Sequence, residues 1–242
     1  MHLLDSDNEE IIISVNPKPA RNTATLAGNS YYFFAEWDGA DLKFTERMID
    51  SRDGNIYKVV TIGNQVWMAE NLKYLPSVVD MSIGSKTDPY YYVYGYSSGT
   101  EVNEAKEKAY YNNIGVLYNY SAAILDVCPT GWHLPNDLEW EQLKTFLGDA
   151  LLVGGKLKEA GNKHWDDPNV GATNESGFTA LPSGMRDNSG EIVATDNFAL
   201  WWSKAEPHVT NPWSYYVARS SAYFNRIGYV KEYGFSIRCV KD

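Results

Sequence analysis

The sequence predicts an α+β fold in which short antiparallel sheets and two main helices are joined by long irregular loops. Helical patterns are confined to the middle of the chain, whereas short β-prone runs lie on both sides of them. Glycine, proline, asparagine and aspartate separate these runs, as is typical of turns between antiparallel strands. Segregated helices and strands of this kind favour α+β over an alternating parallel arrangement.

Residues 1–48 differ from the rest and are predicted to be a small N-terminal β segment or the end of a preceding domain. Three β-prone runs, at 11–15, 23–26 and 31–35, are separated by Pro17, Pro19 and further turn residues. Residues 49–242 are predicted to form the main domain, since this length is ordinary for one large domain.

The main domain is expected to begin with a hairpin and then to turn helical. A β-branched run at 56–62 and a second run at 65–69 flank Gly63-Asn64, which suits a two-residue turn. The mixed-charge run 101–110 predicts a short exposed helix. Alanines and apolar residues at helical spacing predict a short buried helix over 118–125.

The clearest element is a helix over 137–147. Asn136 and Glu139 have the spacing of a capping box, and Gly148 suits the end of a helix. Leu138, Leu143, Phe146 and Leu147 are expected to mark its buried face. Beyond it, strands are predicted in the runs 177–181, 200–203, 213–217 and 235–240.

Composition excludes several classes of function. Lys and Arg number 21 against 31 Asp and Glu, so the net charge of −10 opposes binding to nucleic acid. No stretch approaches the roughly 18–20 apolar residues of a membrane span, and the acidic start of the chain lacks the features of a signal peptide. Aromatic residues make up 14% and Tyr dominates them, a bias typical of binding surfaces.

Two sequence patterns could indicate a functional site, but each could also be an ordinary loop. Gly95-Tyr96-Ser97-Ser98-Gly99 matches the G-x-S-x-G pattern of hydrolases, with Ser97 as nucleophile, but it also reads as a flexible loop. The oxygen-bearing side chains of Asp166, Asp167, Asn169 and Asp187 could supply calcium ligands, although Asp and Asn are also default turn residues. The prediction is no cofactor, with calcium as the alternative.

The chain has two cysteines, Cys128 and Cys239. Two are too few for a four-cysteine zinc site. They could form one long-range disulfide or remain free and buried, and the residues alone leave both readings open.

Many separate motifs resemble the Fibrobacter succinogenes major paralogous domain over roughly residues 50–242. They are Asp53-Gly54-Asn55-Ile56-Tyr57, Ile62-Gly63-Asn64-Gln65-Val66-Trp67-Met68-Ala69-Glu70-Asn71-Leu72, Gly115-Val116-Leu117-Tyr118-Asn119-Tyr120, Cys128-Pro129-Thr130-Gly131-Trp132-His133-Leu134-Pro135-Asn136, Gly154-Gly155-Lys156-Leu157-Lys158, Gly177-Phe178-Thr179-Ala180-Leu181-Pro182-Ser183-Gly184-Met185-Arg186, Trp201-Trp202-Ser203 and Gly234-Phe235-Ser236-Ile237-Arg238-Cys239-Val240.

The resemblance implies a fold similar to C-type lectin-like domains and to the formylglycine-generating group. It also implies a Cys128–Cys239 disulfide and a ligand-bearing loop region at about 161–215. An extracytoplasmic protein of the bacterial cell surface or outer membrane is expected, often a lipoprotein, with the membrane reached only through a lipid anchor that this chain lacks. Glu206-Pro207-His208 departs from the Glu-Pro-Asn triplet of calcium-dependent lectins, so calcium-dependent sugar binding is not expected.

A non-enzymatic binding or adhesion domain for glycan or surface protein is therefore the leading hypothesis. Aromatic faces stack on sugar rings or anchor proteins, and carboxylates and amides orient hydroxyl groups. The candidate ligand-binding residues are Trp165, Asp167, Asn174, Glu175, Arg186, Trp201, Trp202, Asn211 and Trp213. For each tryptophan, burial in the core is the competing reading.

The alternative is a structural or assembly module of a surface appendage, in which residues 1–48 dock as a strand on a neighbouring molecule. A hydrolase that uses Ser97 is the third hypothesis.

Overall fold

The computed structural model describes residues 3–4, 10–14, 22–26, 29–37, 42–97, 99–204 and 210–242, with side chains from residue 46 onward. The chain divides into two compact units, Met1–Val59 and Val60–Asp242. The sequence placed the domain boundary about ten residues earlier, after residue 48. The two units are described separately below.

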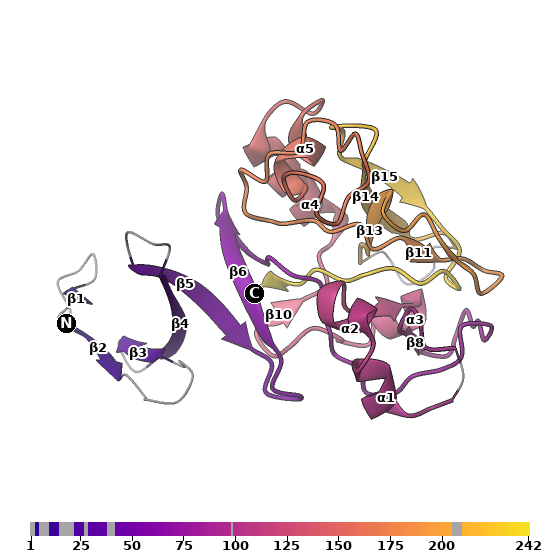
Figure 1. Ribbon diagram of the computed structural model, residues 1–242, viewed down its shortest axis with the longest axis horizontal. Coiled ribbons are helices and arrows are strands. Elements are labelled where there is room, and N and C mark those ends of the chain that lie inside the picture. The colour runs from indigo at the N-terminus through magenta and orange to yellow at the C-terminus, as the bar shows by residue number, and fades with distance from the viewer. Residues whose placement is uncertain are drawn as a thin grey trace. The chain divides into compact units, whose positions relative to one another are not determined.

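The first unit is an antiparallel meander in which each strand pairs with the next one in sequence (Figure 1). The predicted β-prone runs lie in strands, and an unpredicted strand, β5, follows them. Its strands are β1 (Leu3–Leu4), β2 (Glu10–Ser14), β3 (Asn22–Leu26), β4 (Asn29–Trp37) and β5 (Leu42–Ile49). Strand β6 (Ile56–Ile62) begins in this unit, where Ile56 pairs with Ile49.

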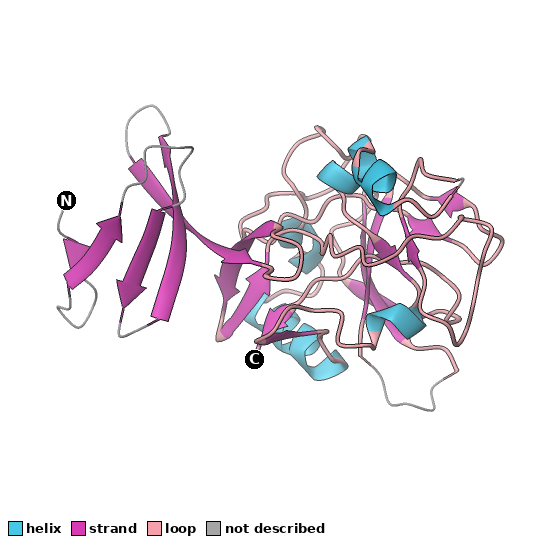
Figure 2. Ribbon diagram, turned by 90° about the horizontal axis from the view of Figure 1, so that it is seen from below, coloured by secondary structure: helices cyan, strands magenta, loops and turns pink. Residues whose placement is uncertain are grey.

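The second unit contains short strands in several small sheets, and long loops connect them (Figure 2). After the end of β6 its strands are β7 (Gln65–Met68), β8 (Tyr91–Tyr92), β9 (Leu117–Tyr118), β10 (Trp132–His133), β11 (Met185–Arg186), β12 (Ile192–Val193), β13 (Phe198–Trp202), β14 (Trp213–Ala218), β15 (Asn225–Gly228) and β16 (Val240–Lys241). The pairs β7–β16, β10–β16, β8–β9, β11–β12, β13–β14 and β14–β15 are all antiparallel. This confirms the α+β class.

Two of the predicted strands are shorter than expected or absent. In the run 177–181 the chain forms only a single bridge, between Ala180 and Lys158. In the run 235–240 only Val240 belongs to a strand, and Phe235 and Ser236 make isolated bridges instead. These segments cross the core between several elements, so no single neighbour runs beside them for long enough to build a ladder.

The helices are short apart from α4. They are α1 (Val102–Lys106), α2 (Ala109–Asn113), α3 (Tyr120–Ala123), α4 (Asp137–Leu147) and α5 (Val153–Leu157). The single exposed helix predicted over 101–110 is two helices, and α5 was not predicted. The predicted helix over 137–147 is confirmed, with both hydrogen bonds of the capping box between Asn136 and Glu139.

The buried face of α4 differs from the predicted one. Leu143 is buried and Leu147 packs partly against the core, as expected. Leu138 and Phe146, however, are 66% and 64% exposed. Trp140 is the central buried residue of the helix instead, and its large ring packs between α4 and the core. The prediction that Leu138 and Phe146 are buried is therefore wrong.

Several large aromatic side chains meet in one cluster around Trp140. Its ring centroid lies 4.6 Å from that of Trp67, 5.2 Å from Tyr215 and 6.1 Å from Trp201. Phe178 approaches Trp201 edge to face at 5.5 Å. A unit with few long helices or strands offers few broad apolar faces, and these rings supply the missing core volume.

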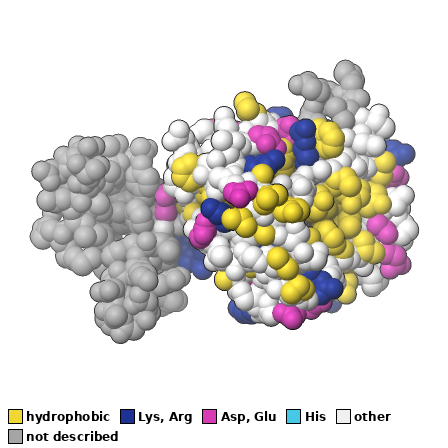
Figure 3. Space-filling model, turned by 90° about the horizontal axis from the view of Figure 1, so that it is seen from above, with side chains coloured by type: hydrophobic (Ala, Val, Ile, Leu, Met, Phe, Trp, Pro, Cys, Tyr) yellow, Lys and Arg dark blue, Asp and Glu magenta, His cyan; other side chains and the backbone are white. Residues whose placement is uncertain are grey.

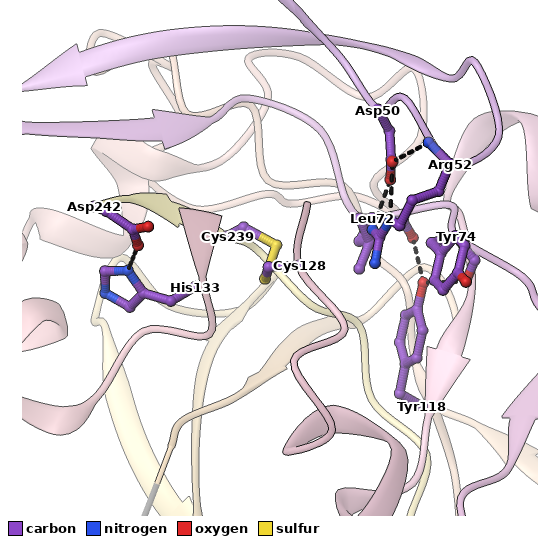
Figure 4. Close-up of a disulfide and its surroundings, with 9 residues drawn as sticks. All are labelled: Asp50, Arg52, Leu72, Tyr74, Tyr118, Cys128, His133, Cys239 and Asp242. Atoms are coloured by element: carbon purple, nitrogen blue, oxygen red, sulfur yellow. Dashed lines mark hydrogen bonds and ion pairs between the residues drawn. A yellow bond between two sulfur atoms is a disulfide. The ribbon is translucent and has the colours of Figure 1, made fainter. Parts of the chain in front are cut away.

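A disulfide joins Cys128 to Cys239, 111 residues apart in sequence, as the resemblance implied (Figure 4). It lies where β10 and β16 run side by side. Next to it, His133 Nδ1 lies 2.6 Å from an Asp242 carboxylate oxygen and Nε2 lies 2.6 Å from Glu139. Burial opposes protonation of His133, but the Asp242 and Glu139 carboxylates outweigh it and raise the pKa of the ring. The C-terminus is thus tied to the start of α4.

Candidate functional site

A hollow beside helix α2 encloses about 520 Å³. We call it the α2 cleft. Its walls come from segments that are far apart in sequence, at 94–95, 108–114, 163–164, 182 and 195–196, and they combine aromatic, amide, hydroxyl and charged groups. The lining residues are Tyr94, Gly95, Lys108, Ala109, Tyr110, Asn113, Ile114, Lys163, His164, Pro182, Thr195 and Asp196.

The α2 wall is fixed to the rest of the second unit by side chains that donate hydrogen bonds to its backbone carbonyls. Lys73 Nζ donates to the carbonyl of Asn112 at 2.8 Å, and Asn71 Nδ2 donates to that of Ile114 at 3.0 Å. The Tyr110 hydroxyl donates to the carbonyl of Ser183, which joins α2 to the opposite wall. Burial raises the pKa of Tyr110 above its ordinary value, so the phenol stays protonated as a donor. The wall is therefore formed before any ligand arrives.

Two tyrosines give this wall an aromatic surface. The rings of Tyr94 and Tyr110 meet edge to face, with centroids 5.3 Å apart and planes at 79°. Tyr94 remains 46% exposed. Tyr110 positions its neighbour, and Tyr94 presents ring surface to solvent at the cleft.

The second wall, around Lys163 and His164, is held by the buried ammonium of Lys158. Its Nζ donates to the carbonyls of Val170, Ala218 and Ser221, each at 2.9 Å. Burial lowers the pKa of Lys158 to about 8, so the charged form with three donors still prevails at neutral pH.

The same segment is secured by two further side chains. Asn169 Nδ2 donates to the carbonyls of Glu159 and Gly161, at 3.0 and 2.7 Å. His164 Nδ1 lies 2.9 Å from both carboxylate oxygens of Glu159. These contacts fix the imidazole at the cleft.

The third wall contains two non-glycine residues with left-handed backbone conformation. Ala194 and Asp196 have φ angles of 59° and 64°. Such residues cost free energy unless their surroundings impose the conformation, and they are frequent at binding sites. The amide of Asp166 donates to the carbonyl of Asp196 at 3.2 Å, which links this wall to the second one.

Three of the four predicted binding tryptophans are buried. Trp165 is 1% exposed, and Trp201 and Trp202 are 0% exposed. Their indole N–H groups donate to Ala180, Asn71 and Tyr118 respectively. They act as core residues in this structure, because their neighbours cover both ring faces and the polar edge.

Arg186 is also buried, at 0% exposure. Nε donates to the carbonyl of Met81 at 2.7 Å, and Nη1 donates to those of Asp187 and Glu232 at 2.9 Å. The guanidinium carbon lies 4.5 Å from the centroid of the Tyr92 ring. Arg186 therefore braces three loops and does not reach a surface ligand.

The other five predicted binding residues are not fully buried. Glu175 pairs with Lys156 at 2.8 Å, and Asn174 bonds to Thr179. Asp167 accepts from Asn162 Nδ2 at 2.9 Å. Asn211 is exposed near the start of β14. The Trp213 ring is 40% exposed, but the Arg226 guanidinium covers one face at 4.7 Å.

The four calcium candidates are engaged by other protein groups. Among the residues that the structure describes, no group of three or more His, Cys, Asp or Glu could hold a metal ion. Asp187 accepts hydrogen bonds from the Ser189 and Glu191 amides, as in a turn. Asp166 lies 3.9 Å from Arg219, and Asn169 uses its amide nitrogen on backbone carbonyls. The triplet at 206–208 lies outside the described residues.

Ser97 is exposed and does not line the α2 cleft, although Gly95 does. Ser98 lies outside the described residues. The two histidines of the described ranges, His133 and His164, are directed at Asp242, Glu139 and Glu159. Neither makes a hydrogen bond to Ser97.

Sequence reasoning missed the residues of the α2 cleft. The run 101–110 was predicted only as a short exposed helix, and the tyrosines between 90 and 96 are the local signal for the aromatic wall. Nothing local, however, indicated that they meet the segments around 163 and 195, because only the tertiary fold brings these loops together.

Other exposed apolar residues lie outside the cleft. Leu138 and Phe146 line a second hollow between α4 and the β6–β7 turn, together with Gln65 and Gln142. Figure 3 shows one face on which apolar side chains gather between charges of both signs. No helix in the described ranges has both the length and the apolar character to cross a membrane.

One comparison with known proteins gives a match. The family model described as the Fibrobacter succinogenes major domain matches residues 60–241, which is nearly the whole of the second unit. No curated protein and no solved structure matches the chain.

Proposed function

The chain belongs to the Fibrobacter succinogenes major domain family, and we propose that its second unit is a binding domain that recognises carbohydrate in the α2 cleft. The observation that carries the proposal is Tyr94, which is held edge to face by Tyr110 and left 46% exposed in a preformed hollow. An exposed aromatic ring of this kind is a suitable platform for the C–H face of a sugar.

The remaining walls supply the polar groups that carbohydrate recognition needs. Asn113, Thr195 and Asp196 offer amide, hydroxyl and carboxylate groups on different sides of the cleft. A volume of about 520 Å³ falls within the usual range for small-molecule sites and suits one to three sugar rings. A mostly fixed wall keeps the ordering cost of binding low.

We also propose an extracytoplasmic location and a C-type lectin-like topology. The Cys128–Cys239 disulfide supports the location, since structural disulfides persist mainly in oxidising compartments. The long loops between α5 and β14 support the topology. Attachment to the cell surface or outer membrane, and a role in adhesion, extend the same proposal.

An array of immobilised oligosaccharides tests the proposal, with Tyr94→Ala as the variant. Removing an exposed stacking ring should lower the affinity for a bound glycan about fivefold to tenfold, because the aromatic contact is worth roughly 1 kcal/mol. Tyr223→Ala is the matched control, as Tyr223 is 47% exposed and lies outside the cleft. Equal effects of the two substitutions, or the absence of glycan binding, would overturn the proposal.

The second candidate function is that of an assembly module, and the strand arrangement of the first unit supports it. Its meander ends in β1, which pairs with β2 on one side, and an outer strand can accept a strand from a neighbouring molecule. Deleting residues 1–48 should abolish assembly in this case and leave glycan binding unchanged.

A further inference from the structure

The charged residues that line the α2 cleft indicate which class of sugar it would bind. The lining contains two lysines, Lys108 and Lys163, against one carboxylate, Asp196. The chain as a whole carries a net charge of −10. A cleft in which cations outnumber carboxylates is therefore a local exception on an acidic molecule.

The two lysines come from different walls. Lys108 immediately precedes α2, and Lys163 lies in the segment that Lys158 and Asn169 hold in place. In the described part of the chain neither ammonium forms a salt bridge. The Lys108 ammonium lies 5.9 Å from the centroid of the Tyr96 ring, which leaves its donors free for a ligand.

The carboxylates on either side of Lys163 in sequence have other partners. Glu159 is directed at His164, Asp166 lies 3.9 Å from Arg219, and Asp167 accepts from Asn162. Lys156 and Lys144, by contrast, each have a glutamate partner elsewhere in the unit. An acidic protein that leaves two lysines unpaired around one hollow can use them to bind an anion.

We propose that the α2 cleft selects sugars that carry a carboxylate, such as uronic acids, with Lys108 and Lys163 as the charge-recognising residues and Tyr94 as the stacking surface. This inference rests on the proposed function. The sugar ring packs on Tyr94, and its carboxylate accepts hydrogen bonds from one or both ammonium groups. Asp196 then orients hydroxyl groups and disfavours a ligand with a second carboxylate nearby.

The experiment compares uronic-acid oligosaccharides with their carboxyl-reduced neutral counterparts, pair by pair, on one array and then by calorimetry at 20 and 300 mM NaCl. The acidic member should bind about tenfold more tightly at the lower salt concentration, and the difference should shrink at the higher one. Lys108→Gln and Lys163→Gln should each reduce binding of the acidic member about twofold to fivefold, with little effect on the neutral member. Lys241→Gln, an equal change of charge at an exposed residue outside the cleft, is the matched control.

The outcomes separate the two proposals. If acidic and neutral members bind equally and both depend on Tyr94, carbohydrate binding stands and the selectivity is overturned. If neither binds, the proposed function itself fails. A preference for the acidic member that survives both lysine substitutions also overturns the inference. So does equal binding of a glutamate-rich peptide, because that result assigns the cleft to protein partners.

Discussion

Arg238 contacts Phe178 in two ways: its guanidinium carbon lies 4.4 Å from the centroid of the ring, and Nη1 donates to the Phe178 carbonyl at 2.5 Å. The same guanidinium reaches Asn71 Oδ1 through Nε at 2.7 Å and the Thr179 carbonyl through Nη2 at 2.9 Å. Arg238 is 1% exposed, and burial lowers its pKa to about 9, with Glu70 partly offsetting the shift. The group remains charged at neutral pH and joins three distant segments.

Replacing Arg238 by Lys is expected to destabilise the protein by about 2–4 kcal/mol, because one ammonium cannot satisfy acceptors spread around a planar guanidinium. Denaturant unfolding measures the loss. Arg219→Lys is the control, since the Arg219 side chain is 37% exposed, and it should cost less than about 0.5 kcal/mol. Equal costs would contradict the role assigned to the buried guanidinium.

Removing the disulfide should lower the free energy of unfolding by about 4–5 kcal/mol in the chain-entropy model, because the bond closes a loop between residues 111 positions apart. The double variant Cys128→Ala/Cys239→Ala tests this in chemical denaturation. Added reductant should destabilise the wild-type protein and leave the double variant unaffected. A variant as stable as the wild type would refute the expectation.

The stability of the protein should depend on the protonation of His133. Since Asp242 and Glu139 raise its pKa in the folded state, the protonated ring stabilises the fold below the ordinary histidine value of 6.5. That contribution is lost as the pH rises through the raised pKa. With the ring one-third exposed, we expect at most about 1 kcal/mol.

Unfolding measured between pH 5.5 and 8.5 checks this prediction. The free energy of unfolding of the wild type should exceed that of His133→Gln by the largest amount at pH 5.5, and this difference should decline toward pH 8.5. Asp242→Asn should flatten the profile in part, because it removes one of the two carboxylates. A difference that grows with pH would show that the sign is wrong.

Helix α4 provides a test of the corrected buried face. Leu143→Ala should cost about 2–5 kcal/mol, as is usual for a fully buried leucine. Leu138→Ala removes the same atoms from a side chain that is 66% exposed, and should change stability by less than about 0.5 kcal/mol. Comparable losses for both substitutions would restore the face predicted from the sequence.

Local interactions explain why parts of this fold were predictable. The boundaries of α4 follow from Asn136, Glu139 and Gly148, which act within one turn of the helix ends. The β6–β7 hairpin likewise follows from Gly63, which has a φ of 64°. The Cys128–Cys239 pairing came from the family resemblance, because two cysteines alone leave free thiols open.

The proposed binding surface could not be predicted in the same way. Trp165, Trp201 and Trp202 lie near turn residues in sequence and were named as candidate binding residues, with burial in the core as the competing interpretation. In a loop-rich unit such rings fill the core instead. Buried and exposed side chains do not alternate along β13, because both faces of the strand are covered: Leu200, Trp201 and Trp202 are all buried. The α2 cleft depends on segments brought together from distant parts of the chain, and no local sequence pattern predicts that they meet.

The cations Lys158, Arg186 and Arg238 direct most of their donors to main-chain oxygens. Every amino acid has a main-chain carbonyl. Substitutions at exposed positions in the segments that these cations hold therefore leave the anchoring hydrogen bonds in place. The molecule is accordingly suited to laboratory diversification: a library randomised at the exposed Lys163, between Lys158 and Val170, should retain the parent architecture, and new specificities could be selected from it.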